Sequence, residues 1–438
     1  MMYQFPNTLR NFAFMLIFIG AIGVIYGFLS VPSIEEVKAS LQPVVTEITH
    51  QSADKITPVT NDEHALHVLH QLQNRPWAAL YVAIFFFMMI SLGVLAFYAI
   101  QHAAQAGWSV VLFRVMESIT AYLPFGTLLL FIFLVFSGLH FNHMFVWMNP
   151  ELFDPESAKF DQLVADKSAF LNIPFFLIRA AIYIAGWNAY RYLARKYSIA
   201  QDNATDNVNY FRLFKLSAAF LVFFIVTESM MSWDWIMTLD PHWYSTLFGW
   251  YIFSSMIVSS VTTIAIVTIY LKSKGYLENV NNSHIHDLAK YMFGFSVFWA
   301  YLWFSQFMLI WYANIPEEVT YFITRMNDYK IPFLGMIVLN LIFPLLLLMN
   351  SDYKKVYGIV IITGIVILVG HYLDVFVMIM PATVGDLWTI GIPEVSSVLL
   401  LLGCFIYIVF KSLTKAPLLA KRNPFVKESE NFHYYNID

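Results

Sequence analysis

Ten apolar runs, separated by short polar segments, dominate this sequence. They cover residues 11–30, 78–101, 119–140, 170–190, 213–235, 247–271, 291–312, 331–349, 356–380 and 393–411. An α-helix rises about 1.5 Å per residue, so a run of roughly 20 residues crosses the ~30 Å hydrocarbon core of a bilayer. Only 12% of the residues are charged, against about 25% in soluble domains. The sequence therefore predicts an all-α, polytopic membrane protein with ten transmembrane helices.

The first run is expected to be a retained helix, because it is longer than the roughly 7–15 apolar residues of a signal peptide. Lysine and arginine are concentrated on one side of the ten runs, and the opposite loops are long but acidic. The basic residues are Arg10, Arg114, Arg191, Arg195, Lys196, Lys272, Lys274, Lys354, Lys355, Lys411, Lys415, Lys421, Arg422 and Lys427. Cytoplasmic loops carry this excess. We therefore expect both termini in the cytoplasm of a bacterium, the chain in its inner membrane, and the loop around Pro241 facing the periplasm.

Charge and cysteine content exclude several classes of site. The net charge of −4 gives no sign of nucleic-acid binding. Cys404 is the single cysteine, so this chain cannot by itself ligate an iron–sulfur cluster through cysteines or attach a c-type haem. His64, His67 and His70 recur three residues apart, near one face of a helix. They are open to two interpretations: a metal site, or part of an amphipathic helix lying on the outer surface.

Ionisable side chains inside apolar runs are costly and are therefore candidates for function. Arg179 and Glu228 lie at similar depth in consecutive runs, so we expect an ion pair that either docks two helices or serves a site. His371 and Asp374 are three residues apart and share a helix face, which favours a hydrogen bond or a proton relay. Glu117 marks the cytoplasmic start of its run.

The outer ends of the runs add a second set of polar residues. His140 and His143 follow the third run and are either interface anchors or bases. Asp240 and His242 lie in the loop around Pro241, which we interpret as the lid of a polar pocket. The hydroxyl-rich inner half of run 247–271 can hold water or bond to its own backbone. The candidates for a proton path are His371, Asp374, Glu228, Arg179, Asp240, His242 and Glu117, and those for a quinone site are His140, His143 and Asp240.

The lid sequence resembles a known signature. Residues 233–251, WDWIMTLDPHWYSTLFGWY, are similar to a motif shared by the two large membrane subunits of bacterial alternative complex III. These subunits are ten-helix relatives of the NrfD/PsrC quinone-reactive proteins. RPWAALYVAIFFF, AGWSVVLFRVMESITAYLP and FLNIPFFLIRAAIYIAGWNAYRYL resemble the ActF subunit more than its paralogue ActC. The resemblance extends over essentially the whole chain.

The resemblance implies an architecture and a setting. Spans 2–5 and 6–9 would form two four-helix bundles, with spans 1 and 10 outside them. The implied division is 1–30 (first helix), 31–77 (periplasmic loop with an amphipathic helix), 78–235 (first bundle), 236–246 (lid), 247–380 (second bundle) and 381–438 (last helix and tail). The complex oxidises quinol and passes electrons to cytochrome c or to a terminal oxidase.

The resemblance also assigns cofactors and partners. Haem c and iron–sulfur clusters belong to partner subunits, among them a multihaem protein, and an ActC-like paralogue pairs with the ActF-like chain. This chain would bind lipids, and the resemblance leaves open whether it also binds quinone. Three alternatives stay open: a secondary transporter using Arg179 and Glu228, a haem-b cytochrome with facing histidines, and a purely structural membrane anchor.

Overall fold

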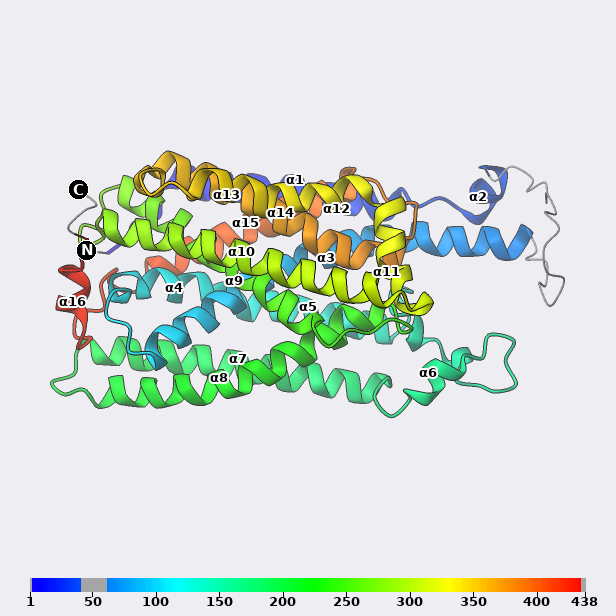
Figure 1. Ribbon diagram of the computed structural model, residues 1–438, viewed down its shortest axis with the longest axis horizontal. Coiled ribbons are helices and arrows are strands. Elements are labelled where there is room, and N and C mark those ends of the chain that lie inside the picture. Colours follow the sequence, from blue (N-terminus) through cyan, green and yellow to red (C-terminus); the bar gives the residue numbers. More distant parts are fainter. Residues whose placement is uncertain (1, 41–60, 435–438) are drawn as a thin grey trace.

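The computed structural model describes residues 2–40 and 61–434, and within them every regular element is a helix. Figure 1 shows a bundle of long, roughly parallel helices with both ends of the chain at the same end of the bundle. That end corresponds to the cytoplasmic side expected from the distribution of lysine and arginine. The fold is the predicted all-α, polytopic membrane protein.

The long helices follow the predicted runs. They are α1 (Asn7–Leu29), α3 (Asn61–Ala103), α5 (Leu123–Gly138), α7 (Ile173–Gln201), α8 (Val208–Trp235), α9 (Phe248–Ser273), α10 (Asn282–Ala313), α14 (Tyr357–Val384) and α15 (Ile392–Leu413). The eighth run is divided into α12 (Lys330–Ile337), a π-helical turn η6 (Val338–Ile342) and α13 (Phe343–Leu348). In the described residues, nine segments are long and apolar enough to cross a membrane. The remaining predicted span, run 170–190, is α7, which is equally long but carries Arg179 and Asn188.

Short helices lie at the two ends of the bundle. They are α2 (Ile34–Ser40), α6 (Gln162–Asp166), α11 (Pro316–Asn327), α16 (Val426–Glu430) and the 3₁₀ turns η3 (Val146–Met148), η4 (Pro150–Leu152), η5 (Met237–Leu239) and η7 (Tyr353–Lys355). In Figure 1, α2, α6 and α11 lie at one end and α16 at the other, near the termini. Amphipathic α11 begins at Pro316, where the missing N–H of proline costs nothing, and it lies against α10 and α14.

The helices pack as two rings of four. In the first ring α3 contacts α5 and α8, and α7 contacts the same two helices. In the second ring α9 contacts α10 and α14, which are bridged by α12 and α13. The rings meet where α3 packs against α9 and α14. Helix α1 packs mainly on α15, and α15 on α3, so these two helices lie outside the rings as expected.

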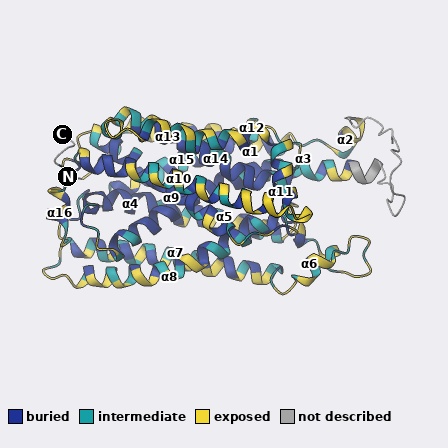
Figure 2. Cartoon of the chain, in the orientation of Figure 1, coloured by how far each residue is buried: buried dark blue, intermediate teal, exposed yellow. Residues whose placement is uncertain are grey.

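The centre of the molecule is the seam between α3 and α9. Figure 2 shows α9 and the inner part of α3 almost wholly buried, where residues 81–99 of α3 are all buried, whereas α1, α7 and α8 carry exposed stripes. The seam is tight because α3 has a glycine at the crossing: a Cβ on Gly93 would lie 2.2 Å from Ser260 Oγ. The Ser260 hydroxyl donates across the seam to the carbonyl of Ile90 at 2.9 Å.

Three predicted boundaries are corrected by the structure. The amphipathic segment expected before residue 78 is continuous with the second span, so α3 runs unbroken for 43 residues. Helix α14 continues past 380 to Val384. The third span, expected to begin at 119, begins earlier as a broken segment: η1 (Val110–Leu112), α4 (Phe113–Ile119), η2 (Thr120–Tyr122) and then α5.

Candidate functional site

Asp374 and His371 lie one turn apart on α14 in the second ring, and both are fully buried. Asp374 accepts hydrogen bonds from the Tyr251 hydroxyl and from Trp299 Nε1, the latter at 2.9 Å. His371 Nδ1 lies 2.9 Å from Ser255 Oγ and 3.6 Å from Asp374 Oδ2. The two titratable groups therefore form one polar cluster with α9 and α10, as their spacing predicted.

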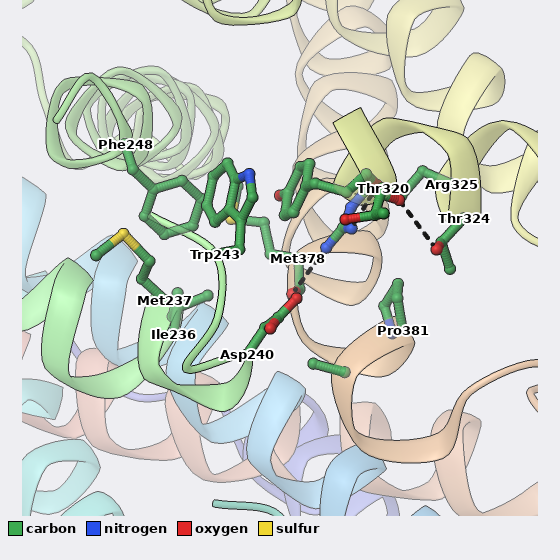
Figure 3. A pocket seen from close by; sticks show the side chains of 12 residues that line it. Ile236, Met237, Asp240, Trp243, Phe248, Thr320, Thr324, Arg325, Met378 and Pro381 are labelled. Atoms are coloured by element: carbon green, nitrogen blue, oxygen red, sulfur yellow. Dashed lines mark hydrogen bonds between the residues drawn. The ribbon is translucent and has the colours of Figure 1, made fainter. Parts of the chain in front are cut away.

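A cavity of about 110 Å³ lies on the outer side of this cluster. Figure 3 shows Asp240, from the lid loop, and Arg325, from α11, entering it from different elements. Trp243 of the lid stacks on Tyr321 of α11 with ring centres 3.9 Å apart. The lid is further held by Lys167, whose ammonium donates to the carbonyl of Pro241 at 2.6 Å. Asp240 and Trp243 of the lid loop thus line this cavity together with residues of α11 and α14.

Arg325 is a second charged residue of this pocket, and it was not among the residues predicted from the sequence. Its side chain is only 5% exposed, and it forms no ion pair among the described residues. The guanidinium lies 3.2 Å from the centre of the Tyr321 ring, donates to the carbonyls of Tyr321 and Met378, and leaves Nε without a partner. A buried, unpaired cation is expensive, so this arginine indicates a site that holds water or charge. Its i, i+4 spacing from Tyr321 was visible in the sequence.

The pocket and the buried cluster are connected by polar side chains. A second, smaller cavity of about 10 Å³ is lined by Tyr251, Gln306, Tyr321 and Arg325. Tyr251 is the residue whose hydroxyl contacts Asp374. Asp240, Arg325 and Tyr321 line the first cavity, Arg325, Tyr321 and Tyr251 line the second, and Tyr251 donates to Asp374, so these residues lie in order between the lid and the middle of the second ring.

On the inner side of His371, several buried polar atoms lack hydrogen bonds. His371 Nε2 has no partner, and neither amide atom of Asn340 has one. Asn340 belongs to the π-helical turn, and a Cβ on Gly370 would lie 2.0 Å from its Oδ1, so it packs directly against the turn that holds His371. The other unpartnered atoms in this ring include the hydroxyls of Ser296, Thr262, Thr268 and Thr363. Buried groups of this kind are usually satisfied by water.

Not every hydroxyl of α9 belongs to this series. Ser259 donates to the carbonyl of Ser255, and Thr263 to that of Ser259. These two residues follow the alternative of bonding to their own backbone. Among the unpartnered groups named above, Thr262 and Thr268 are the ones that belong to the hydroxyl-rich half of α9.

The predicted pair between Arg179 and Glu228 is wrong. Arg179 pairs with Asp234 through two hydrogen bonds, Nε–Oδ2 at 2.9 Å and Nη2–Oδ1 at 2.6 Å. Tyr183 donates to the same carboxylate at 2.9 Å. Glu228 is buried in α8, and its Oε1 has no hydrogen-bond partner. Neither Arg179 nor Glu228 lines the Asp240 pocket, so they lie apart from the proposed series in the second ring.

Glu117 forms a separate inner cluster. Its carboxylate accepts from Arg114 at 2.8 Å, Ser198 at 2.5 Å, Tyr98 at 3.1 Å and Arg195 at 3.3 Å. These contacts join the broken third span to α7. A carboxylate enclosed by two arginines and two hydroxyls is typical of a structural junction rather than of a proton carrier.

His242 points away from the pocket that it was expected to share with Asp240. Its side chain is 58% exposed and its Nε2 lies 2.5 Å from Asp161 Oδ2. Partial burial raises the pKa of Asp161, but the bond with His242 and the backbone N–H of Val164 outweigh it and hold the pKa below its ordinary value. His242 thus fixes the start of α6 on the outer surface, since Asp161 is also the N-cap of that helix.

His140 and His143 line a different, larger outer hollow of about 660 Å³. Residues of α3, including His67 and His70, form its other wall, and the rings of His70 and His143 lie 4.6 Å apart. Asp240 does not line this hollow. The three quinone-site candidates are therefore not brought together in one pocket. The position of the His64 side chain lies outside the described residues.

No family model matches the chain, and no curated protein matches it. In the part of the chain that the structure describes, no three His, Cys, Asp or Glu side chains are arranged to hold a metal ion. What the site offers chemically is a buried carboxylate and imidazole, joined to an outer aqueous pocket by tyrosine and arginine side chains. Such groups transfer protons.

Proposed function

We propose that this chain is an integral membrane subunit of a bacterial respiratory quinol:electron-acceptor oxidoreductase of the alternative complex III type, and that its second ring conducts protons. The observation that carries the proton part is the fully buried Asp374–His371 cluster lying beneath the Asp240–Arg325 pocket. The membership in that complex is supported by the resemblance of the lid and of the three segments quoted above.

The chemistry of the series suits proton transfer. Aspartate and histidine accept and release protons, tyrosine hydroxyls relay them, and an unpaired arginine favours water and negative charge beside it. Ionisable groups buried within membrane spans are functional by default. The unpartnered atoms of His371, Asn340 and Thr363 would continue the series toward the cytoplasm through bound water.

Quinol oxidation is assigned in this proposal to the partner that resembles ActC, with this chain supporting it. The partners would carry haem c and iron–sulfur clusters, and a terminal cytochrome oxidase would accept the electrons. A role as membrane anchor for peripheral subunits is compatible with the same assembly.

The proposal is tested on the complex purified from native membranes in mild detergent and reconstituted into vesicles. Asp374→Asn preserves the shape of the side chain and removes the titratable group; its amide oxygen can still accept from Trp299 while its NH2 group donates to the Tyr251 hydroxyl. We expect Asp374→Asn and His371→Gln to lower the number of protons moved per electron, with the complex still assembled and its haem spectrum unchanged.

Glu151→Gln is the matched control, because Glu151 is an exposed carboxylate of the outer loop that pairs with Lys159. It should leave the proton yield unchanged. An unaltered proton yield in both buried variants would reject the proton path, and purification of the chain without any haem- or iron–sulfur-containing partner would reject the assignment to this complex.

A further inference from the structure

The outer hollow contains four imidazole rings with free ring nitrogens. His67, His70, His140 and His143 all line it, and no ring nitrogen of the four makes a hydrogen bond in the part of the chain described here. We propose that this hollow binds a divalent transition-metal ion, such as Zn²⁺ or Cu²⁺, through the imidazoles of His70 and His143. Imidazole nitrogen is a preferred ligand of both ions.

The separation of the His70 and His143 rings is close to the separation that one shared ion requires. Their ring centres are 4.6 Å apart and the ring planes are inclined by 33°. With metal–nitrogen bonds of about 2.0–2.1 Å and a tetrahedral angle, two imidazoles on one ion would have ring centres roughly 5 Å apart. A small adjustment of the two side chains would therefore admit the ion.

The backbone beneath the two rings is held in place. The backbone N–H of His143 donates to Asn74 Oδ1 at 3.0 Å, and Asn74 Nδ2 donates to the carbonyl of Thr383 at 3.3 Å. Asn74 lies on α3, one turn after His70. This links the loop of His143 to the helix of His70. His140 has a φ of +62°, in the left-handed region that few residues other than glycine adopt. Strained positions of this kind occur preferentially at functional sites.

The charges around the pair tolerate a bound cation. Lys159 lies near His70, but its ammonium is paired with Glu151 at 2.7 Å. The nearest cation is thus already compensated.

Two imidazoles make an exchangeable site rather than a closed structural one. A structural zinc site has four protein ligands, and no set of three is preformed in the described residues. Water and the imidazoles of His67 and His140 would complete the coordination.

Pro381 and Ala382 line both this hollow and the Asp240 cavity, so the ion would lie beside the outer end of the proposed proton path. Its binding does not depend on that path.

The test uses the untagged full chain in detergent, titrated with Zn²⁺ against a fluorescent chelator. We expect saturable binding of one ion per chain. His70→Gln and His143→Gln should each weaken it on the order of 10- to 100-fold, a range that loss of even an outer-shell partner reaches. His242→Gln is the control, because His242 is an exposed outer histidine paired with Asp161, and it should bind as the unmodified chain does.

Electron paramagnetic resonance of bound Cu²⁺ gives a measurement that needs no variant. The unmodified chain should show coupling to at least two imidazole nitrogens. The proposal is overturned by the absence of saturable binding, by a spectrum with oxygen ligands alone, or by equal affinity in His143→Gln and the unmodified chain.

Discussion

Arg179 and Asp234 form a buried ion pair in the first ring of helices. Both side chains are buried, at 4% and 0% exposure, and two parallel hydrogen bonds join them. The guanidinium also lies 3.9 Å from the centre of the Phe170 ring. Removing one member of such a pair leaves an uncompensated buried charge, whereas removing both leaves none.

We therefore expect Arg179→Leu to destabilise the protein by about 3–5 kcal/mol, and the double variant Arg179→Leu/Asp234→Leu to be more stable than Arg179→Leu alone. The measurement is thermal unfolding in detergent. Arg179→Leu/Glu228→Leu is the matched control and should show no such recovery. If the Glu228 double variant recovered stability and the Asp234 double variant did not, the pairing described above would be wrong.

The sequence indicated the depth of Arg179 but not its partner. Glu228 and Asp234 lie on the same helix, six residues and about 9 Å apart along its axis. Hydropathy places a residue along a helix, but the rotation of that helix about its axis is set by packing with its neighbours. The same limit explains Arg325: it lies in a segment that hydropathy marks only as a loop, and packing folds it back over α14.

At the scale of elements, α1 is attached to the molecule through glycines. A Cβ on Gly20 would lie 2.3 Å from the backbone nitrogen of Leu400, and one on Gly23 would lie 1.9 Å from Ser396 Oγ. On the facing helix, a Cβ on Gly403 would lie 2.7 Å from the carbonyl oxygen of Ala13. Small residues at these positions let two membrane helices approach closely, where van der Waals packing holds them.

Gly20→Val should therefore separate α1 from α15 and lower stability by about 1–3 kcal/mol, the usual cost of overpacking. Gly335→Val is the control, because nothing lies within 4 Å of a Cβ on Gly335 and the chemical change is the same. Thermal unfolding of the two variants side by side measures the difference. Equal stability would show that the crossing is not tight.

The positions of the transmembrane helices could be predicted from the sequence, but the interruptions within them could not. Apolar length identifies a span because the bilayer requires it, and the long helices follow the predicted runs. Hydropathy does not report backbone hydrogen bonding, so the break of the third span between Ile119 and Leu123 and the π-helical turn at Asn340 were missed. Pro344 was the available signal for the latter, because it lacks the N–H that would bond to the carbonyl of Asn340.

At the scale of the molecule, the polar residues fall into separate groups. The Glu117 cluster lies at the inner end, Arg179–Asp234 in the first ring, and Asp374–His371 in the second. The sequence grouped these residues as candidates for one proton path, and the structure divides them, because Arg179–Asp234 lies within the first ring of helices and Asp374–His371 within the second. The spacing of His371 and Asp374 was sufficient to predict their contact, since both lie on one helix. Tyr251 and Trp299, which hold Asp374, come from other helices and left no such signal.

The orientation of the whole chain decides which aqueous phase the Asp240 pocket meets. Both termini lie at one end of the bundle (Figure 1), and the positive-inside rule predicts that this end, where the basic loops are expected, is cytoplasmic. The single cysteine allows a direct test: in a Cys404→Ala background, Tyr244→Cys should react with a membrane-impermeant maleimide on intact cells, because Tyr244 is 60% exposed on the lid loop. Lys274→Cys, in an exposed loop at the opposite end, should react only after the membrane is opened. The reverse pattern would place Asp240 and Arg325 on the cytoplasmic side, and the proposed series would then open to the cytoplasm instead of the periplasm.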